Sequence, residues 1–377
     1  MPNTFSEKII RIEKITLHGK RPRNVGMNAR KGVHGDTVTD PVVRIHVEGG
    51  TVGVGWSKIK MEEAKQFLGK QIADLFQLPN GSMETASLID LPLWDLVAKL
   101  SNLPLYQLLG ARGSREVELY DGSIYIDDLD ASDAEASKIF CEEIQTGRQS
   151  GYQNFKIKIG RGARWMPIME GLARDVLVIQ TIRKTAGPEA KILVDANMGN
   201  TLNTTKEIIT RCAEFDIYWF EEPFAEDPSL NQDLKEFIHK NGYDILIADG
   251  EFSPPSYFFE LVRKGWIDIV QHDFRAFGLT WWKRTAEHIE PWGAQCAPHC
   301  WGSHIDRYAH AHFAASIPHY SLLEAAPIDM PGTVLDGWKI YNGKIIVPDS
   351  PGIGFDLDPD VIEKGVKRDD GFTVSIK

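Results

Sequence analysis

Eight short apolar runs recur after about residue 118, and longer stretches with helical periodicity separate them. Such an alternation predicts parallel strands, because a parallel connection needs a crossover that is usually a helix. Eight units between residues 118 and 328 fit a closed α/β barrel better than an open sheet. The predicted strands are 119–124, 154–159, 192–196, 217–222, 245–249, 267–271, 294–298 and 321–324.

Residues 1–117 predict a separate α+β unit, with its strands first and its helices second. Apolar and polar residues alternate over 8–17, and a hairpin is expected at the Gly49-Gly50 pair. Residues 61–110 have mostly helical spacing and end in Leu-Leu-Gly, which is typical of a helix end.

The tail, residues 329–377, is rich in strand and turn residues. We expect it to rejoin the N-terminal unit, because a closed barrel has no free edge to accept it.

The composition excludes several classes of protein. A net charge of −11 argues against general nucleic-acid binding, which needs a basic field. The four cysteines are too scattered for a disulfide framework, and no signal-peptide pattern or bilayer-length apolar stretch is found. We therefore expect a cytoplasmic protein that binds neither nucleic acid nor membranes.

Seven of the eight predicted strands end in ionisable side chains. In an α/β barrel all these strand ends open onto one mouth, where functional groups gather. A single charge there is usually the solvated start of a loop, but seven together indicate a site. The residues are Lys156, Lys158, Asp195, Glu221, Glu222, Asp249 or Glu251, Asp273, His299 and Glu324.

Asp195, Glu221 and Glu251 end or follow adjacent strands and are expected to converge. Unpaired carboxylates repel strongly in a low-dielectric mouth, and a hard divalent cation removes that conflict. Oxygen ligands alone favour Mg²⁺, with Mn²⁺ as a possible substitute. A zinc cluster in the Cys-Ala-Pro-His-Cys sequence of 296–300 is the alternative, but no second Cys/His pair lies nearby.

Two groups of possible bases accompany the carboxylates. Lys156 and Lys158 alternate on one strand and face the same way, so mutual repulsion and burial could leave one lysine neutral enough to accept a proton. His299 and Asp273 follow neighbouring strands, where the carboxylate would orient the imidazole and raise its basicity.

In this order and spacing, the motifs resemble those of the enolase superfamily and, within it, the mandelate racemase-like branch. FKIKIG resembles its Lys-x-Lys strand, and VDAN, WFEEP and the Gly-Glu of ADGE resemble its three metal-ligand motifs. APHCWGSH resembles the His of its His–Asp dyad, and LLE the acid on its last strand. LPLWDLVAKLSNLPLYQLLGA and PDSPGIGFDLD resemble the helical segment before the barrel and the closing segment, so the likeness covers nearly the whole chain.

The resemblance implies an α/β fold: a modified, (β/α)7β-like TIM barrel beneath an α+β capping domain built from the N-terminal part and the C-terminal tail. It implies Mg²⁺ held by Asp195, Glu221 and Glu251, and abstraction of the proton α to a carboxylate to give a stabilised enediolate.

The resemblance also implies roles for the other residues of the mouth. Lys158 would be one base with Lys156 as its helper, and His299, paired with Asp273, would act from the other face. Glu324, protonated, would donate to the enediolate oxygen.

Two departures from the family pattern bear on this site. One residue is missing after Asp273, and Phe277 stands where a glycine is common, which puts the geometry of the Asp273–His299 pair in question. The segment after Lys158, GRGARWMPIMEGLARD, is longer than the usual link.

The enediolate can be protonated on its other face, or lose a β-hydroxyl or a ring oxygen. These outcomes correspond to a racemase or epimerase, an acid-sugar dehydratase giving a 2-keto-3-deoxy acid, and a cycloisomerase of an anhydro-sugar acid or sugar lactone. We expect the dehydratase, because the PHCWG turn resembles some sugar-acid enzymes and the capping segment is basic. A protein that only binds sugar acids is less expected, since it would not need the two predicted bases, and both Lys158 and His299 are present.

The segment from Gly19 to Gly35 is expected to be a loop that covers the mouth, with five basic residues and no acid. Polar and cationic groups there suit a polyhydroxylated small-molecule acid, and a solvated basic loop is the alternative. The predicted substrate-binding residues are Asn197, Arg23, Lys31 and His34. The family resemblance also implies a homo-oligomer.

Overall fold

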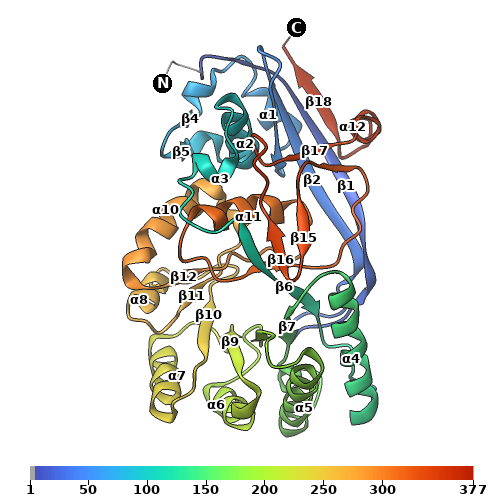
Figure 1. The fold of residues 1–377 in the computed structure, drawn as a ribbon, viewed down its shortest axis with the longest axis vertical. Coiled ribbons are helices and arrows are strands. Elements are labelled where there is room, and N and C mark those ends of the chain that lie inside the picture. The colour runs from blue at the N-terminus through green and yellow to red at the C-terminus, as the bar shows by residue number, and fades with distance from the viewer. Residues whose placement is uncertain (1–4, 377) are drawn as a thin grey trace.

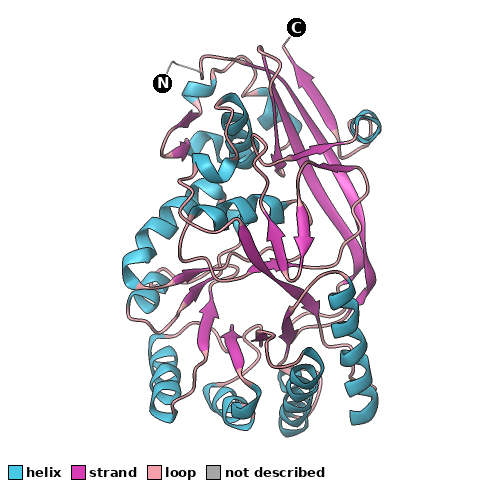
Figure 2. Cartoon of the chain, viewed as in Figure 1, coloured by secondary structure: helices cyan, strands magenta, loops and turns pink. Residues whose placement is uncertain are grey.

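The computed structural model describes residues 5–376. Its lower half in Figure 1 contains parallel strands with helices around them, and the upper half contains a separate antiparallel sheet beside both chain ends. Figure 2 shows the lower helices on the outer side of the strands. No helix of the described residues is long and apolar enough to cross a bilayer.

All eight predicted strands of the lower half are present, and neighbours in sequence pair in parallel from the first to the seventh. The eighth strand pairs with the first, Leu323 opposite Leu119. The strands are β6 Glu116–Ile124, β7 Asn154–Lys158, β8 Ile192–Asp195, β9 Ile217–Glu221, β10 Leu246–Asp249, β11 Ile269–Val270, β12 Gln295–Cys296 and β13 Leu323–Ala325. The helices are α4 Asp133–Gln149, α5 Ile168–Ala186, α6 Leu202–Arg211, α7 Pro228–Asn241, α8 Phe258–Arg263, α9 Phe274–Phe277, α10 Leu279–Ile289 and α11 Asp306–Ser316.

The sheet curls round on itself. Between β12 and the chain entering β13, the Cys296 amide donates to the His319 carbonyl at 3.0 Å and the Ser321 amide donates to the Cys296 carbonyl at 2.9 Å. One buried apolar cluster is shared by residues of strands from both ends of the order. Such a shared interior is typical of a packed barrel centre. Its members are Tyr120, Leu193, Trp219, Ala248, Ile269, Ala297 and Leu322.

The upper sheet has the order β18-β1-β2-β3 and is antiparallel throughout. The predicted hairpin is confirmed, with Gly50 at φ +85° between β2 and β3. The predicted helical region is only partly helical, because residues between α1 and α2 form turns and a two-stranded ribbon. The elements are β1 Ile9–Val25, β2 Gly35–Val47, β3 Val52–Trp56, α1 Met61–Lys65, β4 Phe76–Gln77, β5 Gly81–Ser82, α2 Asp90–Leu100, α3 Leu105–Leu108 and β18 Phe372–Ser375.

The tail returns to the N-terminal unit through one strand and also pairs with the lower half through another. Strand β18 does pair with β1, but β16 pairs with Glu116–Glu118 of β6. This is possible because β6 is long: its pairing with β13 begins only at Leu119, so its first residues keep free backbone groups. The tail elements are β14 Thr333–Leu335, β15 Lys339–Tyr341, β16 Lys344–Ile346, β17 Phe355–Leu357 and α12 Pro359–Gly365.

The basic segment is also not one loop. Strand β1 continues to Val25, and only residues 26–34 form a loop, which lies against the chain just beyond β6. Met27 exchanges two backbone hydrogen bonds with Ile126, of 3.0 and 2.8 Å, just beyond β6. The long segment after Lys158 supports the loop, since Arg164 and the Trp165 indole donate to carbonyls of Arg30 and Asn28 at 2.7 and 2.8 Å.

We expect Asp95→Ala to destabilise the upper half. Asp95 is fully buried on α2 and accepts hydrogen bonds from the amides of Val54 and Ile353, at 2.8 and 2.7 Å, and from Lys99. Removal of the carboxylate leaves these buried donors without an acceptor, which lowers the free energy of unfolding by about 3 kcal/mol. The readout is the thermal unfolding midpoint, with exposed Asp233→Ala as the control. Equal midpoints for the two variants would contradict this role.

Candidate active site

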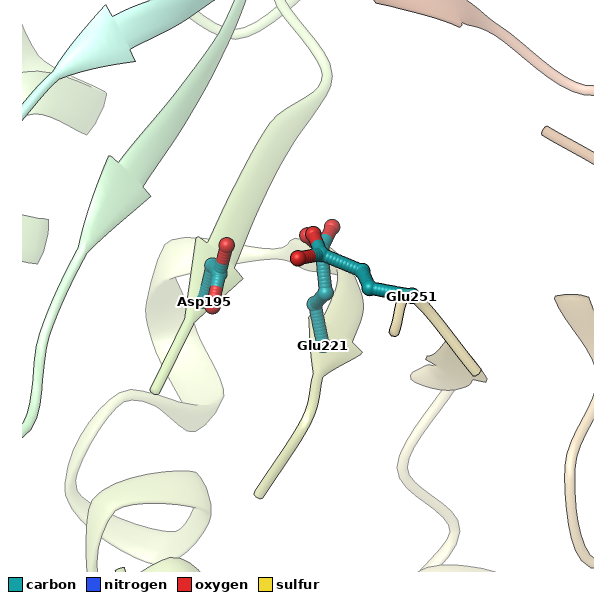
Figure 3. A group of neighbouring side chains, drawn as sticks. All are labelled: Asp195, Glu221 and Glu251. Atoms are coloured by element: carbon teal, nitrogen blue, oxygen red, sulfur yellow. The ribbon is translucent and has the colours of Figure 1, made fainter. Parts of the chain in front are cut away.

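Three buried carboxylates meet at the ends of adjacent strands. Asp195 and Glu221 are the last residues of β8 and β9 and lie opposite each other in register, and Glu251 follows β10. One oxygen of each lies within 4.8 Å of the others. Figure 3 shows the three side chains projecting toward a common point. The predicted convergence is therefore present.

These side chains fit a divalent cation. All are almost fully buried, and Glu251 Oε1 has no hydrogen-bond partner among the described residues. Burial and the charge of Asp195 raise the pKa of Glu221 well above its usual range. Buried, crowded carboxylates with an unused oxygen are the donor set that Mg²⁺ prefers.

Lys156 and Lys158 project into the same group of acids. The Lys156 ammonium lies 2.6 Å from Glu221 Oε1 and 2.9 Å from Glu324 Oε1, and Lys158 pairs with Asp195. Burial lowers the pKa of each lysine, but the acids outweigh it and raise both values. These acids outweigh the effect of the second ammonium, so the neutral lysine stays a prediction for the site with its metal bound.

The predicted pair of His299 and Asp273 is present despite the shortened segment. His299 Nδ1 lies 2.9 Å from Asp273 Oδ2. Asp273 caps α9 by accepting from the Ala276 amide at 2.9 Å, and Arg275 donates to its Oδ2 at 3.0 Å. Burial lowers the pKa of His299, but Glu251 and the bond to Asp273 outweigh it and raise the value.

Glu324 makes contacts that favour its ionised form. Its Oε2 accepts hydrogen bonds from the amides of Cys300 and Trp301, at 2.9 and 3.0 Å, while Oε1 faces Lys156. Burial opposes ionisation, but Lys156 and His299 outweigh it and lower the pKa of Glu324 to about 2. These contacts favour the ionised carboxylate, and a protonated Glu324 stays a prediction.

The zinc alternative has no support in the described part of the chain. There, the acidic triad is the only group of three or more potential ligands that lie close enough together. Cys296 and Cys300 are buried, and burial raises the pKa of both thiols.

Of the predicted substrate residues, Asn197 contacts the triad, and Lys31 and His34 contact other residues of the site. The Asn197 amide donates to Asp195 Oδ1 at 2.8 Å, and its buried side-chain oxygen has no partner among residues 5–376. Lys31 is exposed above Phe252, in a pocket of about 530 Å³ that Asn197 also lines. His34 packs edge-on against Tyr125 and Trp301. Their contact with a substrate stays a prediction.

Arg23 was predicted to bind substrate, and the structure gives it other partners. Its guanidinium lies 2.9 Å from Glu143 on α4 and 3.3 Å from Asp127, and donates to the Ser123 carbonyl at 2.6 Å. These acids are distant in sequence, so a search of the basic segment alone could not find them.

Two aromatic residues and an amide at the site were not predicted. Tyr125 lies 5.2 Å from the Lys158 ammonium and 5.2 Å from the Trp301 ring, measured to ring centroids. Gln271 donates to Glu221 Oε2 at 2.9 Å. Gln271 ends a predicted strand, so a search that included neutral polar residues would have found it. The aromatic residues carry no such signal, because most aromatic residues near strands are core.

Comparisons with known proteins agree with this geometry. Residues 140–361, more than half of the chain, match the enolase C-terminal domain-like family, and the chain belongs to it. A galacturonate dehydratase from Geobacillus sp., solved with D-galacturonate and 5-keto-4-deoxy-D-galacturonate, is 35% identical, with TM-score 0.93 over 98% of this chain and 99% of that one.

Two further proteins are similar. A mandelate racemase/muconate lactonizing protein from Geobacillus sp. Y412MC10, solved with magnesium and tartrate, is 34% identical, with TM-score 0.94 over 99% and 98% of the chains. D-galactarolactone cycloisomerase of Agrobacterium fabrum is 28% identical over 74% of this chain and 73% of that protein. The predicted resemblance to the mandelate racemase-like branch is confirmed, and the chain is an enzyme.

We expect Glu221→Gln to weaken Mg²⁺ binding at least ~100-fold, because it removes one of three anionic ligands. Isothermal titration calorimetry measures the affinity, and exposed Glu214→Gln is the matched control. Mg²⁺ should also raise the thermal unfolding midpoint of the unaltered protein and of the control but not of Glu221→Gln. Equal affinities in the two variants would exclude Glu221 as a ligand.

Proposed function

We propose that this enzyme is a Mg²⁺-dependent lyase that removes the α-proton of a sugar acid and expels its β-hydroxyl as water, giving a 2-keto-3-deoxy acid. Its strands would form a modified TIM barrel of the (β/α)7β type beneath the cap. One observation carries the proposal. Lys158 contacts the triad at Asp195, whereas His299 approaches it from another strand, 3.8 Å from Glu251.

Asp195, Glu221 and Glu251 would hold the metal ion. A carboxylate α-proton is very weakly acidic, and Mg²⁺ bound there would supply positive charge where negative charge develops on the substrate. The solved relative with magnesium and tartrate supports this assignment. That Mn²⁺ can replace Mg²⁺ at this site remains a prediction.

Lys158 would take the α-proton, and Lys156 would stay close beside it. Asp195 and Glu251, which raise the pKa of Lys158, are proposed metal ligands, so a divalent cation would offset this cause of the shift. Glu221 raises the pKa of Lys156 together with Glu324, which is not a proposed ligand. Glu324, ionised, would hold Lys156 and the turn at Cys300 in place rather than donate a proton.

His299 would act on the leaving group. Asp273 fixes the His299 ring through Nδ1 and, as a carboxylate, stabilises the imidazolium. Nε2 is then the nitrogen free to protonate the departing hydroxyl. The carbon–oxygen bond breaks as the electron pair left by the α-proton forms the new double bond, and the enol product becomes a ketone.

A cycloisomerase is the second candidate, and the galactarolactone cycloisomerase relative favours it. Loss of a ring oxygen and loss of a free hydroxyl use the same two bases, so the product distinguishes the reactions. A racemase or epimerase is the third candidate. The galacturonate dehydratase relative favours dehydration and a six-carbon acid. Assembly of the chain into a homo-oligomer stays a prediction.

Proton NMR in D₂O tests the reaction. The protein with Mg²⁺ is incubated with pools of aldonic, aldaric, uronic and anhydro sugar acids. We expect a new 3-deoxy methylene signal from an open-chain acid. The same signal only from an anhydro or lactone acid, in a product with the mass of the substrate, would show a cycloisomerase. Loss of the α-proton signal alone would show a racemase. No change in any pool would contradict the proposal.

We expect Lys158→Ala and His299→Asn each to lower kcat at least ~10³-fold, since general acids and bases contribute 10²–10⁴-fold. Exchange of the substrate α-proton with solvent distinguishes the role of Lys158 from that of His299. His299→Asn should still exchange the α-proton with D₂O while forming no product, and Lys158→Ala should do neither. Exchange retained only by Lys158→Ala would reverse the two roles.

A further inference from the structure

Arg21 is a buried cation that makes no direct ion pair with a carboxylate of residues 5–376; Asp36 acts on it only from a greater distance. Its side chain lies near the end of β1 and is 6% exposed. Among residues 5–376 its recorded hydrogen bonds go to two carbonyls, of Gly35 at 3.4 Å and Thr37 at 3.1 Å, both from Nη1. Arg23, on the same strand, has two carboxylate partners. A buried charge is costly unless an opposite charge compensates it.

The two carbonyl bonds have a structural use, because the register of β1 and β2 shifts between Lys20 and Val25. They occupy one nitrogen of the guanidinium. The buried Nε of Arg21 has no partner among the described residues, and neither has the indole nitrogen of Trp301. Both atoms are donors, so an acceptor group would satisfy them.

Arg21 is connected to the candidate active site through aromatic rings. Its guanidinium carbon lies 4.4 Å from the centroid of the Trp301 ring, which follows His299 by two residues. Trp301 contacts Tyr125, with centroids 5.2 Å apart, and Tyr125 lies 5.2 Å from the Lys158 ammonium. His34 packs against both rings. The rings thus extend from Lys158 to Arg21.

We propose that Arg21 binds a second carboxylate, at the far end of a dicarboxylic sugar acid whose reacting end lies at the triad. A guanidinium can bind a carboxylate through two parallel hydrogen bonds, and stacking on Trp301 fixes its plane. This inference rests on the proposed function, and it identifies the substrate class as aldaric acids.

Matched substrates test the inference. Galactarate and galactonate, like glucarate and gluconate, differ only in a carboxylate or a hydroxymethyl group at the far end. We expect kcat/KM of the unaltered enzyme to be at least ~10-fold higher for the diacid, since a charge-assisted hydrogen bond contributes 1.5–3 kcal/mol. A preference for the hexonate, or for galacturonate, would overturn the inference.

Arg21→Gln should raise KM for the diacid at least ~30-fold, change kcat less than ~3-fold and leave KM for the monoacid within ~3-fold. Arg21→Lys should recover part of the affinity, because it keeps the charge without the planar fork. The control is Lys20→Gln, which removes an exposed charge one residue away. Circular dichroism confirms folding. Equal losses on both substrates would assign Arg21 a structural role only.

The outcomes remain distinct from failure of the proposed function. If no sugar acid is turned over, the lyase assignment fails. If acids are turned over without a preference for diacids, only the inference about Arg21 fails. The preference of the unaltered enzyme decides the inference even if the Arg21 variants do not fold.

Discussion

Mutual repulsion among Asp195, Glu221 and Glu251 is the constraint that organises this site. Three carboxylates within 4.8 Å, nearly excluded from water, need compensating positive charge. Lys156 and Lys158 supply some of it through direct ion pairs. A divalent cation would supply the rest and would weaken the lysines' hold on their protons. Metal binding and base strength are therefore linked through the same acids.

The scaffold brings the charged groups together by strand geometry. Residues two apart on β7 face one way, which puts both lysines in the interior of the curled sheet. The ends of β8 and β9 and the residues just after β10 supply the acids. The extension of β1 to Val25 brings Met27 into contact with Ile126, just beyond β6. The segment after Lys158 then supports the loop of residues 26–34.

The strands and the charged groups at their ends could be predicted from the sequence, because apolar runs and strand ends are local signals. The pairing of strands and side chains that are far apart in the sequence could not be predicted. Strand β16 binds the projecting start of β6, and Arg23 pairs with Glu143 on a helix. The contacts of Glu324 could not be predicted for the same reason, since its ionisation depends on how closely Lys156 approaches from another strand. Which neighbouring charge dominates the pKa of a buried group depends on distances that only the structure gives.

Crystals grown with Mn²⁺ test the central claim most directly. We predict one anomalous peak within about 2.2 Å of an oxygen of Asp195, Glu221 and Glu251, with the ammonium groups of both lysines moved away from their present carboxylate partners. A peak bound elsewhere, or lysine ion pairs unchanged beside an empty triad, would contradict the linkage between metal binding and the bases.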